Sequence, residues 1–303
     1  MADVVAVGSA VLDRVYVLSN LPEPDGGAFA RESTERAGGV AANVACAMAA
    51  LGHDAGVVSR VGDDDAGDTV VDSLTDWDVD ASGVHRGEDA TSYTLVLRGP
   101  DGDRMIVAGG DSVPGLALTD AAREALRDAD CVFTSAYAPD AVVRELVDMR
   151  ENGDVAALVF DLAGPLPELE GRGATPETID AAAEAADLFV ANEVAARSYL
   201  DTDPESAARA LASRGADRVA VTAGAEGAFL ATAEETIHVP ALDVDAVDAT
   251  GAGDAFTAAL VHAWLLGGEN PARAGRTASA AAAQNCTAEG ARGALPTRDD
   301  LSG

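Results

Sequence analysis

The sequence predicts an α/β fold in three layers, α/β/α, with a mostly parallel central sheet and a small β-sheet lid. After Asp111, short apolar runs typical of buried strands alternate with segments of helical periodicity. Such alternation indicates a parallel sheet with helices on both faces. Earlier in the chain, pairs of short polar strands are separated by turn residues. We expect these pairs to form the lid, inserted into one domain that spans residues 1–303.

The N-terminal part of the chain contains the first buried strand and both halves of the predicted lid. The first strand is an apolar run over residues 4–8. The lid is expected over about residues 11–37 and 91–110, where polar and apolar residues alternate around Pro, Gly and Asp turns. Its antiparallel pairs are expected at 14–18 with 28–32 and at 92–97 with 104–108, the second joined by a turn at 99–102. A helix after Gly39, a strand over 55–61 and a helix over about 65–75 lie between them.

The C-terminal part supplies most of the central sheet. Helices are expected over 119–129, 140–152, 178–186 and 205–214, and strands over 131–135, 155–161, 188–191 and 218–222. A hairpin through 227–232 and 236–240 follows. A short strand at 244–247 and helices over 255–266 and 271–284 complete the prediction.

Composition excludes several classes of function. Acidic residues number 52 against 20 basic ones, which are all arginine, and the formal charge is -32. Such acidity keeps a protein hydrated where molar salt screens repulsion to within roughly 3 Å. We therefore expect a cytoplasmic protein of an extreme halophile, against the alternative of an ordinary acidic protein. Without lysine there is no Walker A or Schiff-base chemistry, and without a basic cluster no nucleic-acid surface is expected.

Other features of the sequence agree with a cytoplasmic location. No apolar run approaches the ~20 residues of a membrane span, so no membrane attachment is expected. The cysteines, Cys46, Cys131 and Cys286, are odd in number and widely spaced, which indicates reduced thiols.

Residues 248–256, Asp-Ala-Thr-Gly-Ala-Gly-Asp-Ala-Phe, are the most informative stretch of the chain. Glycines between a strand and a helix let a ligand approach the backbone, and the unpaired N–H groups of the helix attract anions such as phosphate. Asp254 stands inside this anion site. A general base beside a transferring phosphoryl group explains it, with the N–H groups of Gly251, Ala252 and Gly253 stabilising charge. The alternative is an acidic residue that favours a helix N-terminus.

A second signature lies in the N-terminal quarter, where Gly38-Gly39-Val-Ala-Ala-Asn43 opens a helix. Together the two stretches resemble the signatures of the ribokinase-like (PfkB) family of sugar and nucleoside kinases, over nearly the whole chain. The resemblance implies that ligands bind between the lid and the carboxyl ends of the strands. It also implies ATP and Mg²⁺ as cofactors.

The resemblance points to five residues as acceptor contacts. Asp13 follows the first strand, where a carboxylate accepts hydrogen bonds from vicinal sugar hydroxyls, although a lid-surface charge is the alternative. Gly38 and Gly39 admit a substrate to the backbone, and Asn43 presents an amide to a polyol. Tyr137 stands where some pentose kinases of the family carry glutamate. Its ring can pack on a sugar face or on a base of the acceptor, which argues against simple ribose specificity.

The resemblance also implies nucleotide and cation contacts. The family ends the strand over 188–191 in Asn-x-x-Glu, whereas this chain has Asn192 followed by Ala195. Either phosphates and water hold Mg²⁺, or Glu193 or a distant carboxylate compensates. The expected nucleotide residues are Asn192, Thr222, Gly224, Gly227 and Ser279. Asp248, Thr250, Asn285, Ala288 and Gly290 resemble a set that binds a monovalent cation, K⁺ in this setting, with a helix C-terminal turn as the alternative.

We therefore expect an ATP-dependent kinase that phosphorylates a hydroxyl group of a small sugar. A nucleoside, a 2-keto-3-deoxygluconate-type acid and a sugar phosphate are alternative acceptors. A non-catalytic sugar or nucleotide sensor on the same fold is the alternative of another class. A homodimer formed through the lid is also left open.

Overall fold

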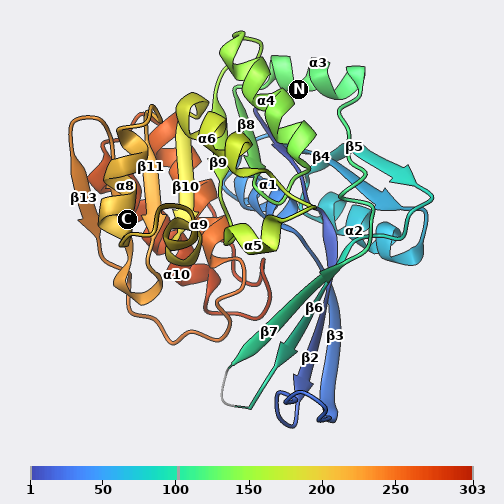
Figure 1. Cartoon of the computed structure of the whole chain (residues 1–303). Coiled ribbons are helices and arrows are strands. Elements are labelled where there is room, and N and C mark those ends of the chain that lie inside the picture. The colour runs from blue at the N-terminus through green and yellow to red at the C-terminus, as the bar shows by residue number, and fades with distance from the viewer. Residues whose placement is uncertain (1, 101–102, 302–303) are drawn as a thin grey trace.

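The protein contains two β-sheets, a large central one and a small one that projects from it (Figure 1). The structure is a computed structural model and describes residues 2–100 and 103–301. The central sheet has nine strands in the order β13-β12-β11-β10-β9-β8-β1-β4-β5. Its strands from β5 to β11 pair in parallel, and β12 and β13 add an antiparallel edge. The predicted α/β fold, mostly parallel with a small lid, is confirmed.

The elements alternate along the chain as the sequence predicts. The strands of the central sheet are β1 (Val4–Val7), β4 (Ala55–Gly62), β5 (Asp80–Gly87), β8 (Cys131–Ser135), β9 (Leu158–Asp161), β10 (Leu188–Asn192), β11 (Val219–Thr222), β12 (Ala228–Ala231) and β13 (Thr236–Val239). The helices are α1 (Val40–Ala50), α2 (Asp65–Asp76), α3 (Asp120–Asp128), α4 (Asp140–Glu151), α5 (Leu166–Leu169), α6 (Pro176–Ala185), α7 (Glu193–Leu200), α8 (Pro204–Ala212), α9 (Ala252–Leu260) and α10 (Pro271–Asn285).

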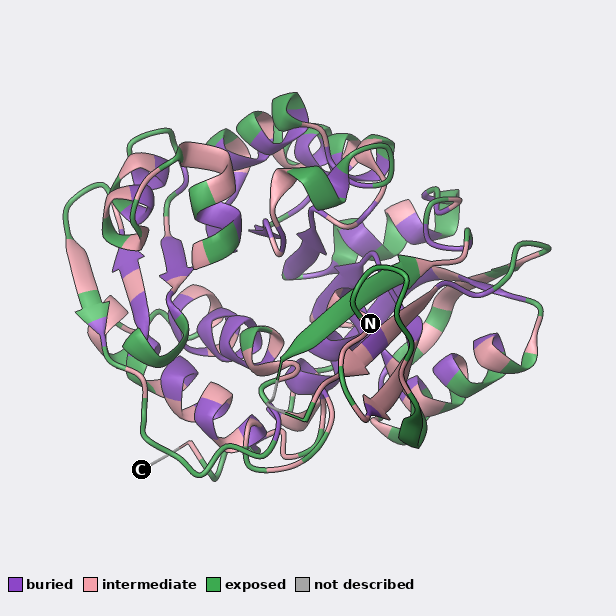
Figure 2. Cartoon of the chain, turned by 60° about the horizontal axis from the view of Figure 1, so that its bottom comes forward, coloured by how far each residue is buried: buried purple, intermediate pink, exposed green. Residues whose placement is uncertain are grey.

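Two apolar cores lie on opposite faces of the central sheet (Figure 2). Successive residues of a strand point to opposite faces. In β1, Val5 and Val7 therefore join the core with α4, α6 and α8, while Val4 and Ala6 join the core with α1, α9 and α10. Strands buried on both faces need continuous apolar runs. This requirement explains sequences such as Leu-Phe-Val-Ala in β10.

The lid is one four-stranded sheet made from both predicted pairs. Its strands are β2 (Val11–Leu18), β3 (Ala30–Gly38), β6 (Tyr93–Arg98) and β7 (Arg104–Gly109), in the order β3-β2-β6-β7. The antiparallel pairs β2–β3 and β6–β7 are joined by a parallel pairing of β2 with β6. The predicted turn at 99–102 includes Asp101 and Gly102, which lie outside the described residues.

Two sequence predictions differ from the structure near the C-terminus. No strand forms at residues 244–247, because Val244 and Val247 are exposed rather than packed against the sheet. The helix predicted over 255–266 begins earlier, at Ala252, after Gly251 adopts a positive φ of 74°. It then continues as a π-helical turn over Val261–Leu266. The earlier start places Asp254 inside the first helical turn.

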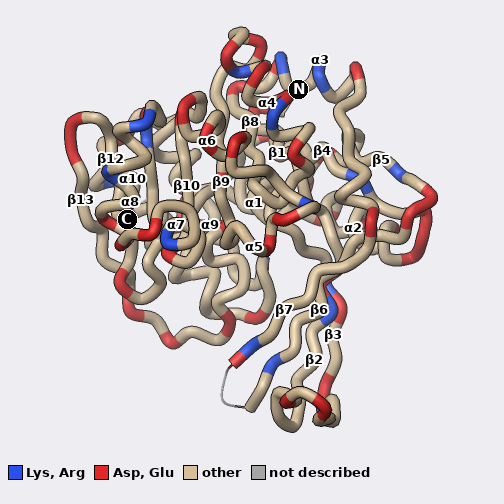
Figure 3. Tube along the Cα trace, viewed as in Figure 1, with Lys and Arg blue, Asp and Glu red and all other residues tan. Residues whose placement is uncertain are grey.

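Acidic residues are spread over the helices and loops of the body and the lid (Figure 3). This distribution is what the formal charge of -32 requires. All three cysteines are free, with Cys46 and Cys131 buried and Cys286 half-buried. None of the helices within residues 2–100 and 103–301 combines the length and apolar character needed to cross a membrane.

Candidate active site

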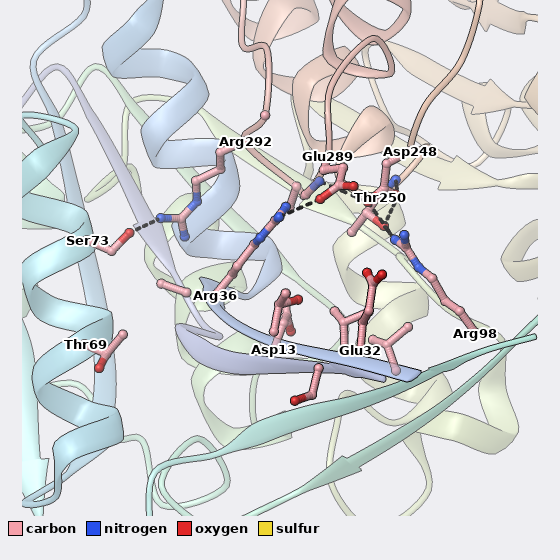
Figure 4. A pocket seen from close by; sticks show the side chains of 18 of the residues that line it. Asp13, Glu32, Arg36, Thr69, Ser73, Arg98, Asp248, Thr250, Glu289 and Arg292 are labelled. Carbon is pink, nitrogen blue, oxygen red and sulfur yellow. Dashed lines mark hydrogen bonds and ion pairs between the residues drawn. The ribbon is translucent and has the colours of Figure 1, made fainter. Parts of the chain in front are cut away.

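A cavity of about 660 Å³ opens between the lid and the body (Figure 4). The lid supplies Asp13, Val15 and Val17 from β2, and the body supplies helix α2 and the loops at 248–250 and 289–293. The acidic residues of its wall are accompanied by the arginines Arg36, Arg98 and Arg292. The strand order reverses at β1, which lies between β8 and β4, and the chain that follows β1 reaches the cavity wall at Asp13. Open α/β sheets bind ligands at such a point.

Asp254 is linked to two residues from other parts of the chain. The Asn43 Nδ2 donates a hydrogen bond of 2.8 Å to the Asp254 Oδ2. The Arg292 Nε in turn donates to the Asn43 Oδ1 at 2.8 Å, and the Arg292 Nη1 donates to the Ser73 Oγ at 3.1 Å. Because Arg292 engages the amide oxygen, the Asn43 NH₂ group is directed at the carboxylate. The remaining nitrogen, Nη2, is buried and has no hydrogen-bond partner among the described residues.

Burial sets the electrostatics of the carboxylates around Asp254. Burial raises the pKa of Asp254 to about 7, while the hydrogen bond from Asn43 opposes the shift and the charge of Asp161 adds to it. Burial likewise raises the pKa of Asp161 to about 7. Asp13 is raised to a pKa of about 6 by burial, against the opposing effects of a hydrogen bond from Thr94 and the charge of Arg292. Carboxylates with a pKa near neutral are suited to proton transfer at physiological pH.

The glycines at 38 and 39 fix the position of Asp13 and the start of α1. A Cβ at Gly38 would lie 2.0 Å from the Asp13 Oδ2, so any side chain there would displace the carboxylate. Gly39 has a φ of 97°, and a Cβ there would lie 2.5 Å from the Ser9 carbonyl oxygen. Both positions therefore require glycine for a packing reason, beside any contact with a substrate.

A second cavity, of about 640 Å³, lies on the other side of the 248–254 turn. Four of the five predicted nucleotide residues line it, Thr222, Gly224, Gly227 and Ser279, together with Ala252, Gly253 and the Phe256 ring. The exposed segment at 242–246, predicted in part as a strand, forms one of its walls. Thr250 faces the first cavity while Ala252 and Gly253 face the second, so the turn separates two ligand-sized spaces.

The turn at 248–254 presents backbone N–H groups from the first turn of α9. A Cβ at Gly253 would meet no heavy atom within 4 Å, so its backbone is open to a ligand. A Cβ at Gly251 would lie 2.2 Å from the Ala291 carbonyl oxygen, which shows how closely the 290–292 loop packs behind the turn. The N–H of Ala252 points back to the Ala249 carbonyl in a long bond of 3.3 Å.

The residues predicted to bind a monovalent cation lie together behind this turn. The Asp248 carboxylate accepts hydrogen bonds from Arg98, Thr250 and the N–H of Gly290. The buried Asn285 Nδ2 donates to the carbonyl oxygens of Thr250 at 3.2 Å and of Ala291 at 3.1 Å. Ala288 belongs to the same loop but lines neither cavity.

Asn192 and Tyr137 are placed outside both cavity walls. Asn192 caps α7, because its Oδ1 accepts a hydrogen bond of 2.8 Å from the Ala195 N–H. The Tyr137 hydroxyl donates to the Glu168 Oε2 at 2.8 Å. Burial, with the neighbouring Glu168 carboxylate, raises the pKa of Tyr137 well above its usual range.

The structure narrows the choice of residues that could hold Mg²⁺. Ala195 is fully buried in an apolar core, and Glu193 pairs with Arg197 at 2.6 Å on the surface. In residues 2–100 and 103–301, no group of three or more His, Cys, Asp or Glu side chains is placed to hold a metal ion. Asp161 ends β9 at the same sheet edge as Asn192, since Ala163 bonds to both side chains. Asp161 lines neither of the two cavities, and a Mg²⁺ ion with this one protein carboxylate would take its other ligands from phosphate and water.

Sequence reasoning missed Asp161, Arg36, Arg98 and Arg292. Asp161 carries a usable signal, a carboxylate directly after an apolar strand, where ligands of parallel sheets gather. The arginines carry no such signal in the sequence. Arg36 and Arg98 meet Glu289 and Asp248, respectively, only when the lid has folded against the body.

Comparisons with known proteins relate the sequence of this chain to carbohydrate kinases. The pfkB family of carbohydrate kinases matches residues 1–298. An ATP-dependent ribose-1-phosphate kinase of Halopiger xanaduensis is 34% identical over 306 residues, covering 100% of this chain and 97% of the relative. The ribokinase of Bacillus subtilis is 29% identical, covering 99% and 98%.

Solved structures show the same fold. Arabidopsis thaliana ribokinase complexed with ribose and ATP superposes with a TM-score of 0.84 at 24% identity, covering 99% of this chain and 97% of that one. A ribokinase from Thermotoga maritima gives a TM-score of 0.84 at 24% identity, covering 99% and 98%. With a whole-chain family match and a relative 34% identical along its full length, the chain belongs to the pfkB family of carbohydrate kinases.

Proposed function

We propose that the protein transfers the γ-phosphoryl group of ATP to a hydroxyl group of a small sugar, with Asp254 as the general base. The supporting observation is the position of the 248–254 turn between two cavities, one lined by Asp13 and one by the predicted nucleotide residues. A phosphoryl group held at this turn lies between donor and acceptor. Transfer of this kind depends mainly on positioning and electrostatic stabilisation.

Each part of the site has a distinct role in this proposal. Asp13 and Asn43 orient the acceptor, and Asp254 takes the proton of the attacking hydroxyl. The backbone N–H groups of Gly251, Ala252 and Gly253 stabilise the charge of the transferred group. Thr222, Gly224, Gly227 and Ser279 hold the nucleotide.

Asp161 is the side chain that would hold Mg²⁺, with ATP phosphates and water as the other ligands. The bound ion would neutralise charge on the phosphates. Asp161 is buried at the carboxyl end of β9, and its charge acts on Asp254. Its own N–H···O bond from Ala163 at 2.8 Å fixes the orientation of the carboxylate.

We further propose that the acceptor carries a phosphate, as in the ribose-1-phosphate kinase named among the relatives. Arg36 pairs with Glu289 at 2.8 Å, but their side chains are 40% and 67% exposed. Exposed pairs contribute little, about 0–1 kcal/mol, so Arg36 can exchange Glu289 for a phosphate. Arg292 has no ion pair with a carboxylate among the described residues and stands beside Asn43. Arginine is well suited to such a phosphate.

A substrate panel in molar KCl tests both proposals. ATP would be offered with a pentose 1-phosphate, the free pentose, a nucleoside and a 2-keto-3-deoxy sugar acid. We expect the sugar phosphate to have the highest kcat/KM. A free sugar or nucleoside as the best acceptor would refute the phosphate proposal, and binding without turnover of any acceptor would instead support a sensor.

A pair of lid variants sharpens this test. Arg36→Gln should raise the KM for the phosphorylated acceptor roughly 10- to 100-fold, because a hydrogen bond to a charged group contributes about 1.5–3 kcal/mol. Its KM for a free sugar should change little. Arg31→Gln, on the exposed part of the same strand, removes the same charge away from the cavity and serves as the control.

The lid also suggests the partner, a second copy of this chain. Phe29, Met105, Ile106 and Val107 are exposed apolar side chains of the lid, with 83%, 48%, 55% and 52% of their surface accessible. The last three follow one another on the lid edge strand β7. We expect a homodimer through these residues, measured by light scattering in molar salt, and its loss in Ile106→Arg. A monomeric wild type would exclude it.

A further inference from the structure

The Asp248 carboxylate, which resembles part of a monovalent cation site, has all of its acceptor positions filled. A carboxylate offers about four such positions, two on each oxygen. Oδ1 accepts from the Thr250 N–H at 3.0 Å and from the Thr250 hydroxyl at 2.6 Å. Oδ2 accepts from the Arg98 Nη2 at 2.6 Å and from the Gly290 N–H at 2.9 Å.

The charge of Asp248 is already balanced by a side chain of the lid (Figure 4). The Asp248 side chain is 6% exposed, so this ion pair with Arg98 is shielded from salt far better than the pair of Arg36 with Glu289. The carboxylate is therefore anionic and paired.

Two carbonyl oxygens of the same set also accept hydrogen bonds, that of Gly290 from the Gly293 N–H at 3.1 Å and that of Thr250 from the Asn285 side chain. The Asn285 amide NH₂ group spans the carbonyls of Thr250 and Ala291, at 3.2 Å and 3.1 Å. The Asn285 Oδ1 is buried without a hydrogen-bond partner among the described residues. A single neutral oxygen gives a cation far less than the several oxygens that metal ions take from proteins.

We propose that Arg98, assisted by the Asn285 amide, replaces the monovalent cation in this protein. The guanidinium supplies the positive charge at Asp248, and the amide hydrogens bridge the 248–251 turn to the 285–291 loop. The protein then needs salt for solubility but has no selective K⁺ site. Because Arg98 belongs to lid strand β6, this charge reaches the turn only when the lid lies against the body. The proposal rests on the proposed function in one respect only, that the 248–254 turn binds the transferred phosphoryl group.

Thermal unfolding can separate a selective ion from general salt. K⁺ would replace choline stepwise, from none to about 0.2 M, at a constant molar ionic strength, so that the screening of charges stays unchanged. We expect the wild-type Tm to stay constant. Arg98→Met frees the Asp248 oxygen, so its Tm should be lower and should rise saturably with K⁺, by roughly 4 °C at a hundredfold excess over Kd.

Arg104→Met is the matched control. Arg104 lies opposite Arg98 in the β6–β7 pairing and is exposed, so this change removes the same charge from the same hairpin. Its Tm should not respond to K⁺. A saturable K⁺ response of the wild type, or a folded Arg98→Met protein without one, would overturn the proposal.

Anomalous diffraction from wild-type crystals grown with Rb⁺ provides a test that does not depend on folding of the variant or on activity. We expect no Rb⁺ within coordination distance of Asp248 and Thr250, and a peak there would refute the replacement. A failed kinase assay would refute the proposed function while leaving both of these results unaffected.

Discussion

Replacement of Asp254 by Asn removes the proposed base while keeping the size of the side chain and an oxygen that can accept from Asn43. A general base contributes typically ~10²–10⁴-fold, so kcat should fall by that factor. The nucleotide cavity is lined by Ala252, Gly253 and Phe256 but not by Asp254. The affinity of the variant for ATP should therefore stay within a few fold of the wild-type value. The substitution therefore separates catalysis from nucleotide binding.

The pH dependence of kcat/KM provides a second measure of the contribution of Asp254. Burial raises the pKa of Asp254 to about 7, and only the deprotonated form can accept a proton. With that pKa, about 10% of the sites are active at pH 6 and about 90% at pH 8, so kcat/KM should rise roughly tenfold between them. Because the hydrogen bond from Asn43 lowers this pKa, Asn43→Ala should move the same limb to higher pH.

The assay is a coupled measurement of ADP release at several pH values in molar KCl, with ATP binding followed by calorimetry. A phosphorylated acceptor itself titrates with a pKa near ~6, and Asp254→Asn retains that ionisation. The ratio of wild-type to variant kcat/KM at each pH therefore reports the base alone. Near-wild-type turnover of Asp254→Asn, or a ratio independent of pH, would refute the role of Asp254.

Three further predictions concern the acceptor, the metal and the solvent. Asp13→Ala should raise the KM for the acceptor and leave the KM for ATP unchanged, since each lost hydrogen bond to a charged group contributes roughly 1.5–3 kcal/mol. A rise in the KM for ATP alone would show that the acceptor and nucleotide sites are exchanged. Ala195→Glu should not lower the Mg²⁺ concentration required, but it should lower the free energy of unfolding by about 3–5 kcal/mol, because it places a charge in an apolar core at a fully buried position. Glu193→Gln should leave the half-saturating Mg²⁺ concentration unchanged. Urea unfolding from ~0.1 to ~2 M KCl should show stability rising with salt as the screening length falls from ~10 Å to ~4 Å or less, and full stability in dilute buffer would contradict the halophilic interpretation.

The sequence was sufficient to predict most of the fold, because short continuous apolar runs such as 188–191, alternating with helical segments, are typical of buried strands in a parallel sheet. The prediction of strands from apolar runs was wrong where apolar residues line a cavity instead of packing in the sheet. Val244 was predicted in a strand over 244–247, yet it lines the second cavity together with Leu242. The sequence also could not predict that β2 and β6 pair in parallel, because nothing local joins residues from such distant parts of the chain.

The candidate active site likewise contains residues that the sequence predicts and residues that only the structure reveals. Asp254, Asp13 and Asn43 stand in long local signatures, and the structure brings the first and last of them within 2.8 Å. Arg98 and Arg292 have no such signature, since their neighbours are set by the lid and by a loop from the far end of the chain. Ala195 was recognised as a departure from the family pattern, but only the structure shows that its side chain points into an apolar core.

The parallel pairing of β2 with β6 has a consequence for the order of folding. Leu12 pairs with Tyr93, and the chain between them forms β3, α1, β4, α2 and β5. Closing so long a connection costs entropy before any contact within the lid repays it. The lid sheet is therefore expected to assemble after β1, β4 and β5 have joined the central sheet. A newly made chain then acquires its nucleotide cavity from the C-terminal body, and its acceptor cavity exists only once the two distant hairpins have met.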